Sequence, residues 1–241
     1  VSPSTGVSAI AFRDGDQQVV SGMTDGSIRI WNAQTGDLIR ELKGHENFVS
    51  SLSVHPDGTI ASASWGNRGR LWDGNSENWF QEINDQQQRI QGVAFCNQGN
   101  QLLTWEPRGS IWLRDYQNDA NDATGAPSAT IVVSQKFQHP GDLRRVAISH
   151  TGRLIAAGGK DNRIHLFRVD STADEAADTP PVSAKQESGT RVHVATLPGN
   201  RSSTDSLCFS QDDTVVVVGR VDQRIEALST ETFATVARLR G

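Results

Sequence analysis

Residues Leu42 to Asp73 decide the fold, and they read LKGHENFVSSLSVHPDGTIASASWGNRGRLWD. A Gly-His pair lies near the start of this stretch and a Trp-Asp pair closes it. Between the pairs lie three short apolar runs, Val49 to Val54, Ile60 to Ser64 and Gly69 to Trp72, which polar turns separate. Apolar and polar residues alternate in the first run, which is typical of a strand with one buried face. The stretch therefore predicts consecutive short β-strands.

The same repeat occurs five times along the chain. The turn between its first two strands marks the register, and the equivalent positions are Gly15, Gly58, Gly99, Gly152 and Asp213. The first three positions are 43 and 41 residues apart, and the later steps are 53 and 61 residues. Two polar insertions, residues 117–128 and 170–190, account for the longer steps. Because they contain few large apolar residues, we expect both to be surface loops.

The pattern predicts four strands and no helix in each repeat. In the first repeat the expected strands are Val7–Phe12, Gln18–Met23, Ser27–Asn32 and Leu38–Leu42. No window of about 11–18 residues keeps the apolar period of a helix, and turn signals recur every 8–12 residues or so. The chain is therefore expected to be all-β.

A Gly-His pair, about four strands and a Trp-Asp pair, repeating every 40–45 residues or so, resemble the WD-repeat (WD40) β-propeller family. The resemblance implies one propeller region over residues 1–241, with four-stranded antiparallel blades at about 7–42, 45–83, 90–137, 143–197 and 206–239. Rings of this family usually have about seven blades. Both ends of the chain fall between repeats, so we expect an arc of a larger ring, with the remaining blades in the same longer chain. The divergent repeats resemble bacterial-style arrays.

In the family, a His, a Ser or Thr, an Asp and a Trp hydrogen-bond across a blade, and this role is structural. No blade of this chain has the complete set: in the second repeat Gly66 replaces the turn Asp, and in the fourth Ala157 replaces the hydroxyl. Position by position, the resemblance assigns to the network Ser21, Asp25, Trp31, His45, Ser62, Trp72, Thr104, His139, Asp161 and Asp222.

The bulk properties exclude several classes of function. A net charge of −5 and a pI of about 5.7 favour no nucleic-acid partner. The sequence contains no apolar run of about 18 residues, so no membrane segment is expected. Cys96 and Cys208 each lie one residue from a Phe in an apolar run, which predicts two buried, reduced thiols. The compartment is not readable from these residues, with the cytoplasm favoured.

The sequence carries no recognisable catalytic or metal-binding motif. No two of the six histidines fall at metal-ligand spacing, and there is no Cys-X-X-Cys, His-Glu-X-X-His or phosphate-binding Gly-rich loop. We therefore expect no metal, no cofactor and no enzyme activity within these residues. A Ser-His-Asp triad assembled across blades stays open, because triads are defined by geometry.

In the family, the links between fourth and first strands and the turns between second and third strands build the face that binds partners. Trp65 lies in such a turn, and Trp and Arg are the residue types most enriched at interface hot spots. The alternative is that Trp65 and Trp105 extend the core over the blade edge. The partner-binding candidates are Phe48, Trp65, Arg68, Arg89, Trp105, Arg108, Lys160 and Arg220.

These observations favour a non-catalytic protein–protein interaction scaffold that presents its top face to a protein or peptide. The alternative is an accessory sensor or regulatory propeller of a larger enzyme, such as a Ser/Thr kinase or a peptidase. A third hypothesis, hydrolytic chemistry on the propeller itself, needs an acid–base cluster that the sequence does not reveal.

Overall fold

The computed structural model describes residues 5–66, 68–76, 78–84, 88–96, 99–119, 127–169, 193–197 and 203–240. Within these ranges the regular structure is β-strand without α-helix, and the strands form five four-stranded antiparallel sheets. The expected all-β fold with four-stranded antiparallel blades is therefore confirmed. The described residues contain no helix long and apolar enough to cross a lipid bilayer.

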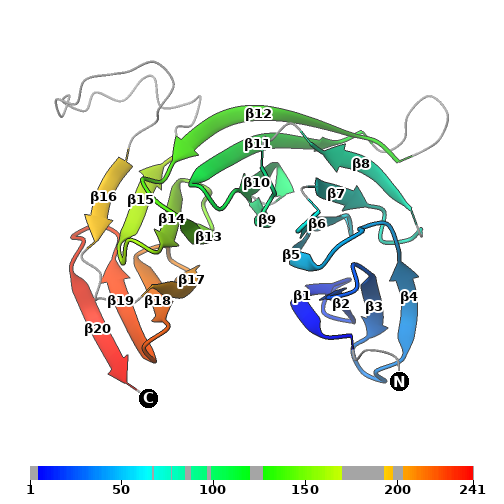
Figure 1. Cartoon of the computed structure of the whole chain (residues 1–241), viewed down its shortest axis with the longest axis horizontal. Coiled ribbons are helices and arrows are strands. Elements are labelled where there is room, and N and C mark those ends of the chain that lie inside the picture. Colours follow the sequence, from blue (N-terminus) through cyan, green and yellow to red (C-terminus); the bar gives the residue numbers. More distant parts are fainter. Residues whose placement is uncertain are drawn as a thin grey trace. The chain divides into compact units, whose positions relative to one another are not determined.

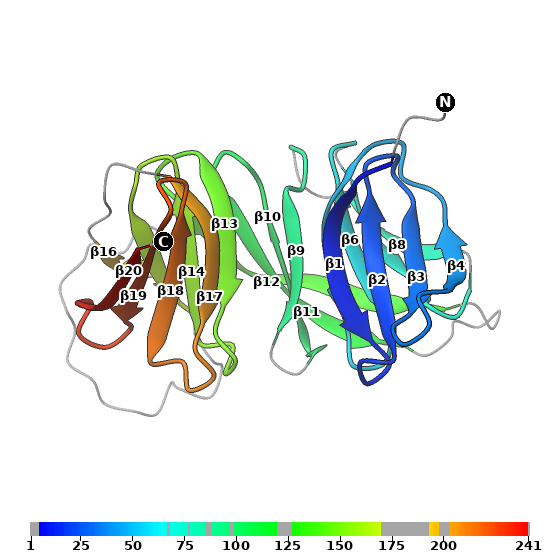
Figure 2. The same ribbon diagram turned by 90° about the horizontal axis from the view of Figure 1, so that it is seen from below.

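The chain divides into two compact units, and the first comprises Val1–Pro107 and Trp112–Ser134. In each sheet, hydrogen-bonded neighbours are consecutive in the chain, as Figure 2 shows for the first sheet. The first sheet contains β1 (Val7–Arg13), β2 (Gln18–Met23), β3 (Ile28–Asn32) and β4 (Leu38–Leu42). The second contains β5 (Val49–Val54), β6 (Ile60–Ser64), β7 (Arg68–Trp72) and β8 (Trp79–Ile83). The third contains β9 (Gly92–Cys96), β10 (Gln101–Trp105), β11 (Ser110–Asn118) and β12 (Ala129–Gln138).

The second unit comprises Arg108–Ile111 and Gln135–Gly241, so it includes one end of β11 and one end of β12. Its fourth sheet contains β13 (Leu143–Ile148), β14 (Leu154–Gly159), β15 (Ile164–Arg168) and β16 (His193–Leu197). Its fifth sheet contains β17 (Thr204–Phe209), β18 (Val215–Arg220), β19 (Arg224–Ser229) and β20 (Thr235–Arg240). Figure 1 labels these strands along the chain.

The turns between first and second strands share one backbone feature. The five register positions of the sequence all have a positive φ: Gly15 (58°), Gly58 (92°), Gly99 (99°), Gly152 (72°) and Asp213 (59°). Asp213 adopts this conformation without being Gly, and its carboxylate accepts the backbone N–H groups of His150 (2.7 Å) and Thr151 (2.9 Å). These bonds join the fifth sheet to the fourth.

The observed strands of the first sheet differ by no more than one residue at any end from those expected. The expected insertion 117–128 begins later than predicted, because Gln117 and Asn118 belong to β11. Residues 120–126 of this insertion and all of 170–190 lie outside the described residues.

Apolar side chains from adjacent sheets form the core of each unit, as expected for sheets that cannot bury both faces alone. Between the first and second sheets lie Val20, Ile28, Ile30, Leu42, Val49, Ile60 and Trp72. Between the second and third lie Ala61, Ala63, Leu71, Ile83, Ile90, Val93, Leu102, Tyr116 and Ala129. Between the fourth and fifth lie Ala156, Ile164, Leu166, Phe209, Val216, Val218 and Leu228.

Serine side chains join the first strands of neighbouring sheets in the first unit. The Ser8 hydroxyl on β1 donates to the carbonyl oxygen of Val49 on β5, at 2.5 Å. On β5, the Ser51 hydroxyl lies 3.2 Å from the Val93 carbonyl oxygen of β9, and the Ser53 hydroxyl accepts the Phe95 N–H at 2.9 Å. The sheets are therefore joined by hydrogen bonds as well as by apolar packing.

The two cysteines differ in exposure. Cys96 is buried, and burial raises the pKa of its thiol to about 12, so the thiolate does not form at neutral pH. Cys208 is exposed, so the prediction that it is buried was wrong. It lies on β17 between half-buried Leu207 and buried Phe209, and the alternation of a strand places its side chain on the exposed face.

Candidate functional site

Three partner-binding candidates converge on one surface of the first unit. Phe48 lies in the link from β4 to β5, Trp65 in the turn from β6 to β7, and Arg89 in the link from β8 to β9. The rings of Phe48 and Trp65 meet edge to face with their centroids 5.2 Å apart. The Arg89 guanidinium carbon lies 4.4 Å from the centroid of the Trp65 ring, which is a cation–π distance. We call these three residues the Trp65 cluster.

The backbone around Trp65 explains why its side chain stays at the surface. The Trp65 N–H donates to the Phe48 carbonyl oxygen at 3.1 Å, which fixes the turn against the link. The Ser64 hydroxyl donates to the Asn47 carbonyl oxygen at 2.9 Å and accepts the Gly66 N–H at 3.3 Å. Trp65 remains 51% exposed, so it packs over the blade edge only in part. The result is an exposed indole whose orientation is already fixed.

Three further candidates are exposed. Arg68, in the first unit, pairs with Glu82 at 2.7 Å. Arg108 and Lys160 belong to the second unit, where Lys160 donates to Asp142 at 2.7 Å. This hydrogen bond and the charge of Lys160 lower the pKa of the Asp142 carboxyl.

Two candidates do not lie on the surface. Trp105 is only 7% exposed, and its ring covers Gly92 so closely that a Cβ there would clash with the indole. Arg220 is 4% exposed, and its Nε donates to Glu226 at 2.8 Å. We leave both out of the proposed surface, because neither side chain offers area to a partner.

The second sheet contains a polar network like the one that the resemblance implies. The Ser62 hydroxyl accepts the Trp72 indole N–H at 2.8 Å and lies 2.6 Å from His45 Nε2. Burial, with the nearby charge of Arg70, lowers the pKa of His45 to about 3, so the imidazole is neutral at neutral pH. In the first sheet the Trp31 indole N–H donates to the Ser21 hydroxyl at 2.7 Å.

Asp25 bonds within its own turn and not to the Ser21–Trp31 pair. Its Oδ1 accepts the Ser27 backbone N–H at 2.9 Å and the Ser27 hydroxyl at 2.7 Å, and its Oδ2 lies 3.4 Å from Arg29. Burial alone would raise the pKa of Asp25, but the Ser27 hydrogen bonds and the Arg29 charge outweigh it, so the pKa is lowered.

We expect Asp25→Ala to reduce the free energy of unfolding by about 0.5–1.5 kcal/mol, because partly exposed donors recover hydrogen bonds to water. Urea titration followed by circular dichroism measures the change. Asp25→Asn, which keeps an oxygen acceptor for Ser27, should cost less. A loss above about 3 kcal/mol would show that Asp25 belongs to a buried network.

The third and fifth sheets replace the network with charged side chains. In the third, the Arg114 guanidinium donates to the Thr104 hydroxyl, and Arg114 is 1% exposed. In the fifth, Asp222 lies 3.6 Å from Arg224 at the surface. The buried polar pair there consists of Arg220 and Glu226.

The fourth sheet brings together two histidines and a carboxylate that sequence spacing did not connect. His139 follows β12, Asp161 lies in the turn from β14 to β15, and His165 lies on β15. Their potential ligand atoms all lie within 4.8 Å of one another. His165 Nε2 is 2.6 Å from Asp161 Oδ2, and the two imidazole centroids are 4.5 Å apart. The two histidines are distant in sequence and come from different elements, so a search for local motifs misses them.

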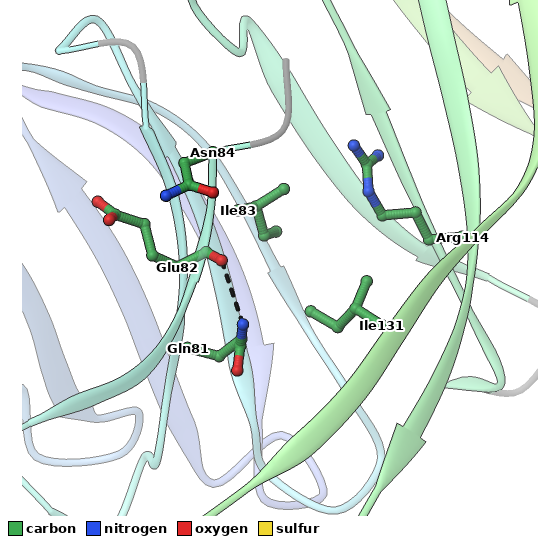
Figure 3. Close-up of a pocket in the computed structure, with 6 residues that line it drawn as sticks. All are labelled: Gln81, Glu82, Ile83, Asn84, Arg114 and Ile131. Carbon is green, nitrogen blue, oxygen red and sulfur yellow. Dashed lines mark hydrogen bonds between the residues drawn. The ribbon is translucent and has the colours of Figure 1, made fainter.

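A pocket of about 190 Å³ opens between β8 and the β11–β12 pair in the first unit. Its lining, shown in Figure 3, is Gln81, Glu82, Ile83, Asn84, Arg114 and Ile131. Ligand pockets usually enclose about 300–1,000 Å³. The pocket is smaller than that, so we assign it no ligand.

Ser62 and His45 are residue types that serve as a nucleophile and its base, but both are buried and a substrate cannot reach them. Ser62 is 0% exposed and His45 is 9% exposed, and the Ser62 hydroxyl already accepts the Trp72 N–H. A serine nucleophile must reach a substrate carbonyl, which this serine does not.

The WD40 family model, described as "WD domain, G-beta repeat", matches residues 2–32, 36–73 and 132–168. The second match covers β4 to β7, and the third covers most of β12 together with β13 to β15. Each of these two therefore includes residues of the last strand of one sheet and three strands of the next. WD40 repeats are thus present in three places in this all-β, propeller-like chain.

Curated relatives contain similar stretches. The chain is 29% identical over 155 residues to "TBC1 domain family member 31" of Xenopus tropicalis, which covers 62% of this chain and 13% of the relative. It is 29% identical over 153 residues to the Mus musculus protein of that name, covering 62% and 14%. It is 27% identical over 177 residues to "Periodic tryptophan protein 2 homolog" of Mus musculus, covering 68% and 19%.

The chain therefore spans less than a fifth of the length of these relatives. All of them come from vertebrates, and they give no support to the bacterial-style interpretation of the repeats.

Proposed function

We propose that this chain is a non-catalytic interaction module, a WD-repeat propeller region that binds a protein or peptide through the Trp65 cluster. WD40 repeat proteins generally mediate protein interactions, and three stretches of the chain match that model. The observation that carries the proposal is Trp65 itself, half exposed between Phe48 and Arg89. Exposed Trp and Arg side chains in a fixed geometry are typical of binding hot spots, since little side-chain entropy is lost on binding.

The surface favours a partner of particular chemistry. Trp65 offers apolar area, and Arg89 offers a guanidinium group 4.4 Å from the centroid of its ring. Guanidinium groups bind carboxylates with directional hydrogen bonds. We therefore infer an extended peptide or loop that combines an apolar anchor with an acidic side chain.

Trp65→Ala should reduce partner binding by at least about tenfold, the usual loss at a hot spot. Trp79 supplies the matched control: it is 40% exposed, and the Arg70 guanidinium lies 4.6 Å from its ring. Trp79 is opposite Trp72 in the sheet, at one end of β7. Trp65 follows Ser64, which is opposite Arg68 at the other end of β7, so the two tryptophans lie at different ends of the strand. Quantitative affinity capture with wild type, Trp65→Ala and Trp79→Ala, followed by titration of the recovered partner, makes the measurement. Equal binding by all three proteins would refute the proposal.

A second proposal is that the region acts as an accessory sensor or regulatory propeller within a larger protein. It is supported by the length of the relatives, of which this chain matches 13–19%. The name of several relatives refers to a TBC1 domain and not to a kinase or peptidase. If this proposal holds, Trp65→Ala in the whole protein alters the activity of the attached domain, whereas Trp79→Ala does not.

A further inference from the structure

The His139, Asp161 and His165 side chains form a cluster that the proposed binding function does not use. All three belong to the second unit. The side chains of His139 and His165 are 0% and 5% exposed, and that of Asp161 is 26% exposed. The cluster is therefore buried on the imidazole side and open to solvent at the carboxylate.

His139 presents a bare nitrogen to the cluster. Its Nδ1 lies 2.9 Å from the Gly141 carbonyl oxygen and 3.1 Å from the Gly141 N. If Nδ1 carries the proton and donates to the carbonyl, Nε2 keeps its lone pair. In the other tautomer, a buried Nε2–H has no acceptor, since Asp161 Oδ1 is 3.8 Å away, beyond hydrogen-bond range. Among the described residues, Nε2 has no hydrogen-bond partner.

The second sheet shows why this nitrogen is bare. There the equivalent His45 Nε2 is bonded to the Ser62 hydroxyl at 2.6 Å. Ser62 pairs with Arg70 across β6 and β7, and the corresponding pair in the fourth sheet is Ala157 with His165. The hydroxyl is thus replaced by a methyl group, and the arginine by a second imidazole. In the fourth sheet His139 has lost its serine partner and faces another potential ligand.

The remaining ligand atoms are held in place by neighbouring backbone and side chains. The Arg163 N–H donates to Asp161 Oδ1 at 3.2 Å, while Oδ2 lies 2.6 Å from His165 Nε2. Gly159 leaves room for the His139 ring, since a Cβ there would lie 2.9 Å from His139 Cε1. Such outer contacts orient the ligands of metal sites.

We propose that His139 Nε2, the Asp161 carboxylate and His165 Nε2 bind a divalent first-row transition-metal ion, of which Zn²⁺ is the reference case. Two imidazoles and a carboxylate suit such an ion better than Ca²⁺ or Mg²⁺, which prefer oxygen ligands. In a tetrahedral zinc site with metal–ligand bonds of about 2.0–2.2 Å, ligand atoms lie roughly 3.4 Å apart. His165 Nε2 lies 2.6 Å from Asp161 Oδ2, and His139 Nε2 lies 3.8 Å from Asp161 Oδ1. All the candidate ligand atoms lie within 4.8 Å of one another, so the side chains must shift to reach that separation around one ion. The ion takes the position of the proton between His165 and Asp161. It enters from the side of the Asp161 carboxylate, which is open to solvent.

The competing explanation is a hydrogen-bonded cluster without a ligand, in which both imidazoles only surround the carboxylate. Zinc titration separates the two. The full chain, free of affinity tags and stripped with EDTA, is titrated with Zn²⁺ by calorimetry and with Co²⁺ by visible absorption. We expect one ion per chain, visible bands of a four- or five-coordinate Co²⁺ site, and a higher melting temperature with Zn²⁺ present.

Asp161→Asn and His165→Gln should each weaken Zn²⁺ binding by at least about tenfold. His150→Gln and Cys208→Ser are the controls, because each removes an exposed potential ligand outside the cluster and should leave binding unchanged. Circular dichroism without metal establishes that each variant is folded. Fewer than half an equivalent of Zn²⁺ bound by the wild-type chain overturns the proposal whatever the variants do. Binding that survives in folded Asp161→Asn and His165→Gln, or that disappears in either control, overturns it as well.

Discussion

Replacing Trp72 with Ala is expected to lower the free energy of unfolding by about 3–5 kcal/mol, the range for removing a fully buried aromatic side chain. Trp72 is 0% exposed and lies in the apolar core between the first and second sheets. Its loss leaves a cavity there, and it also removes the N–H that the Ser62 hydroxyl accepts. Urea-induced unfolding followed by circular dichroism gives the change directly.

Two further variants separate packing from hydrogen bonding at Trp72. Trp72→Phe keeps most of the ring and removes the indole N–H, so it should cost about 1–2 kcal/mol. Trp31→Ala is the matched control, because Trp31 donates the same hydrogen bond to Ser21 but is only half-buried. Its cost should be clearly smaller than that of Trp72→Ala. Equal costs at the two positions would contradict the view that burial decides the effect.

Glu226→Leu should destabilise the second unit by about 3–5 kcal/mol, since it removes the carboxylate that meets a buried guanidinium. The side chains of Arg220 and Glu226 are 0% and 3% exposed, and they meet at 2.8 Å. Unfolding of the single variant in urea measures the loss.

The double variant Arg220→Met with Glu226→Leu should recover most of that stability, because an apolar pair of similar volume avoids desolvating two charges. Arg238→Met is the control: Arg238 also contacts Glu226, at 3.3 Å, but its side chain is 65% exposed. Because the Arg238 guanidinium stays largely in water, we expect Arg238→Met to cost only about 0–1 kcal/mol. If the double variant is as unstable as Glu226→Leu alone, the cost lies in lost packing and not in the unpaired charge.

The strand pattern was predictable because it depends on local chemistry. Alternation of apolar residues and turns such as Asp25-Gly26 define the strands of the first sheet to within a residue. The register positions from Gly15 to Asp213 all adopt the positive φ that such turns require. Neither the alternation nor the turn conformation depends on contacts with the neighbouring sheet.

At the candidate site, the burial of a side chain and the residues that it contacts depend on neighbouring strands and sheets, so the sequence predicted them less well. Trp105 ends β10 and Trp65 directly follows β6, which are the second strands of their sheets. Yet Trp105 lies over Gly92 and is buried, while Trp65 stays exposed. Arg220 was expected at the surface because the resemblance places it in a turn between second and third strands, but Glu226 on the next strand pairs with it in the interior. The Trp65 cluster was predicted as three separate surface residues, and only the fold shows that they touch.

The serine hydroxyls between neighbouring sheets bear on aggregation. β5 and β9 are the first strands of their sheets and pair with another strand on one side only. Such strand edges usually act as templates for β-strands of other molecules. Here Ser8, Ser51 and Ser53 bond backbone groups of Val49, Val93 and Phe95 on these strands. An invading strand must therefore displace bonds that the second and third sheets already make to the preceding repeat.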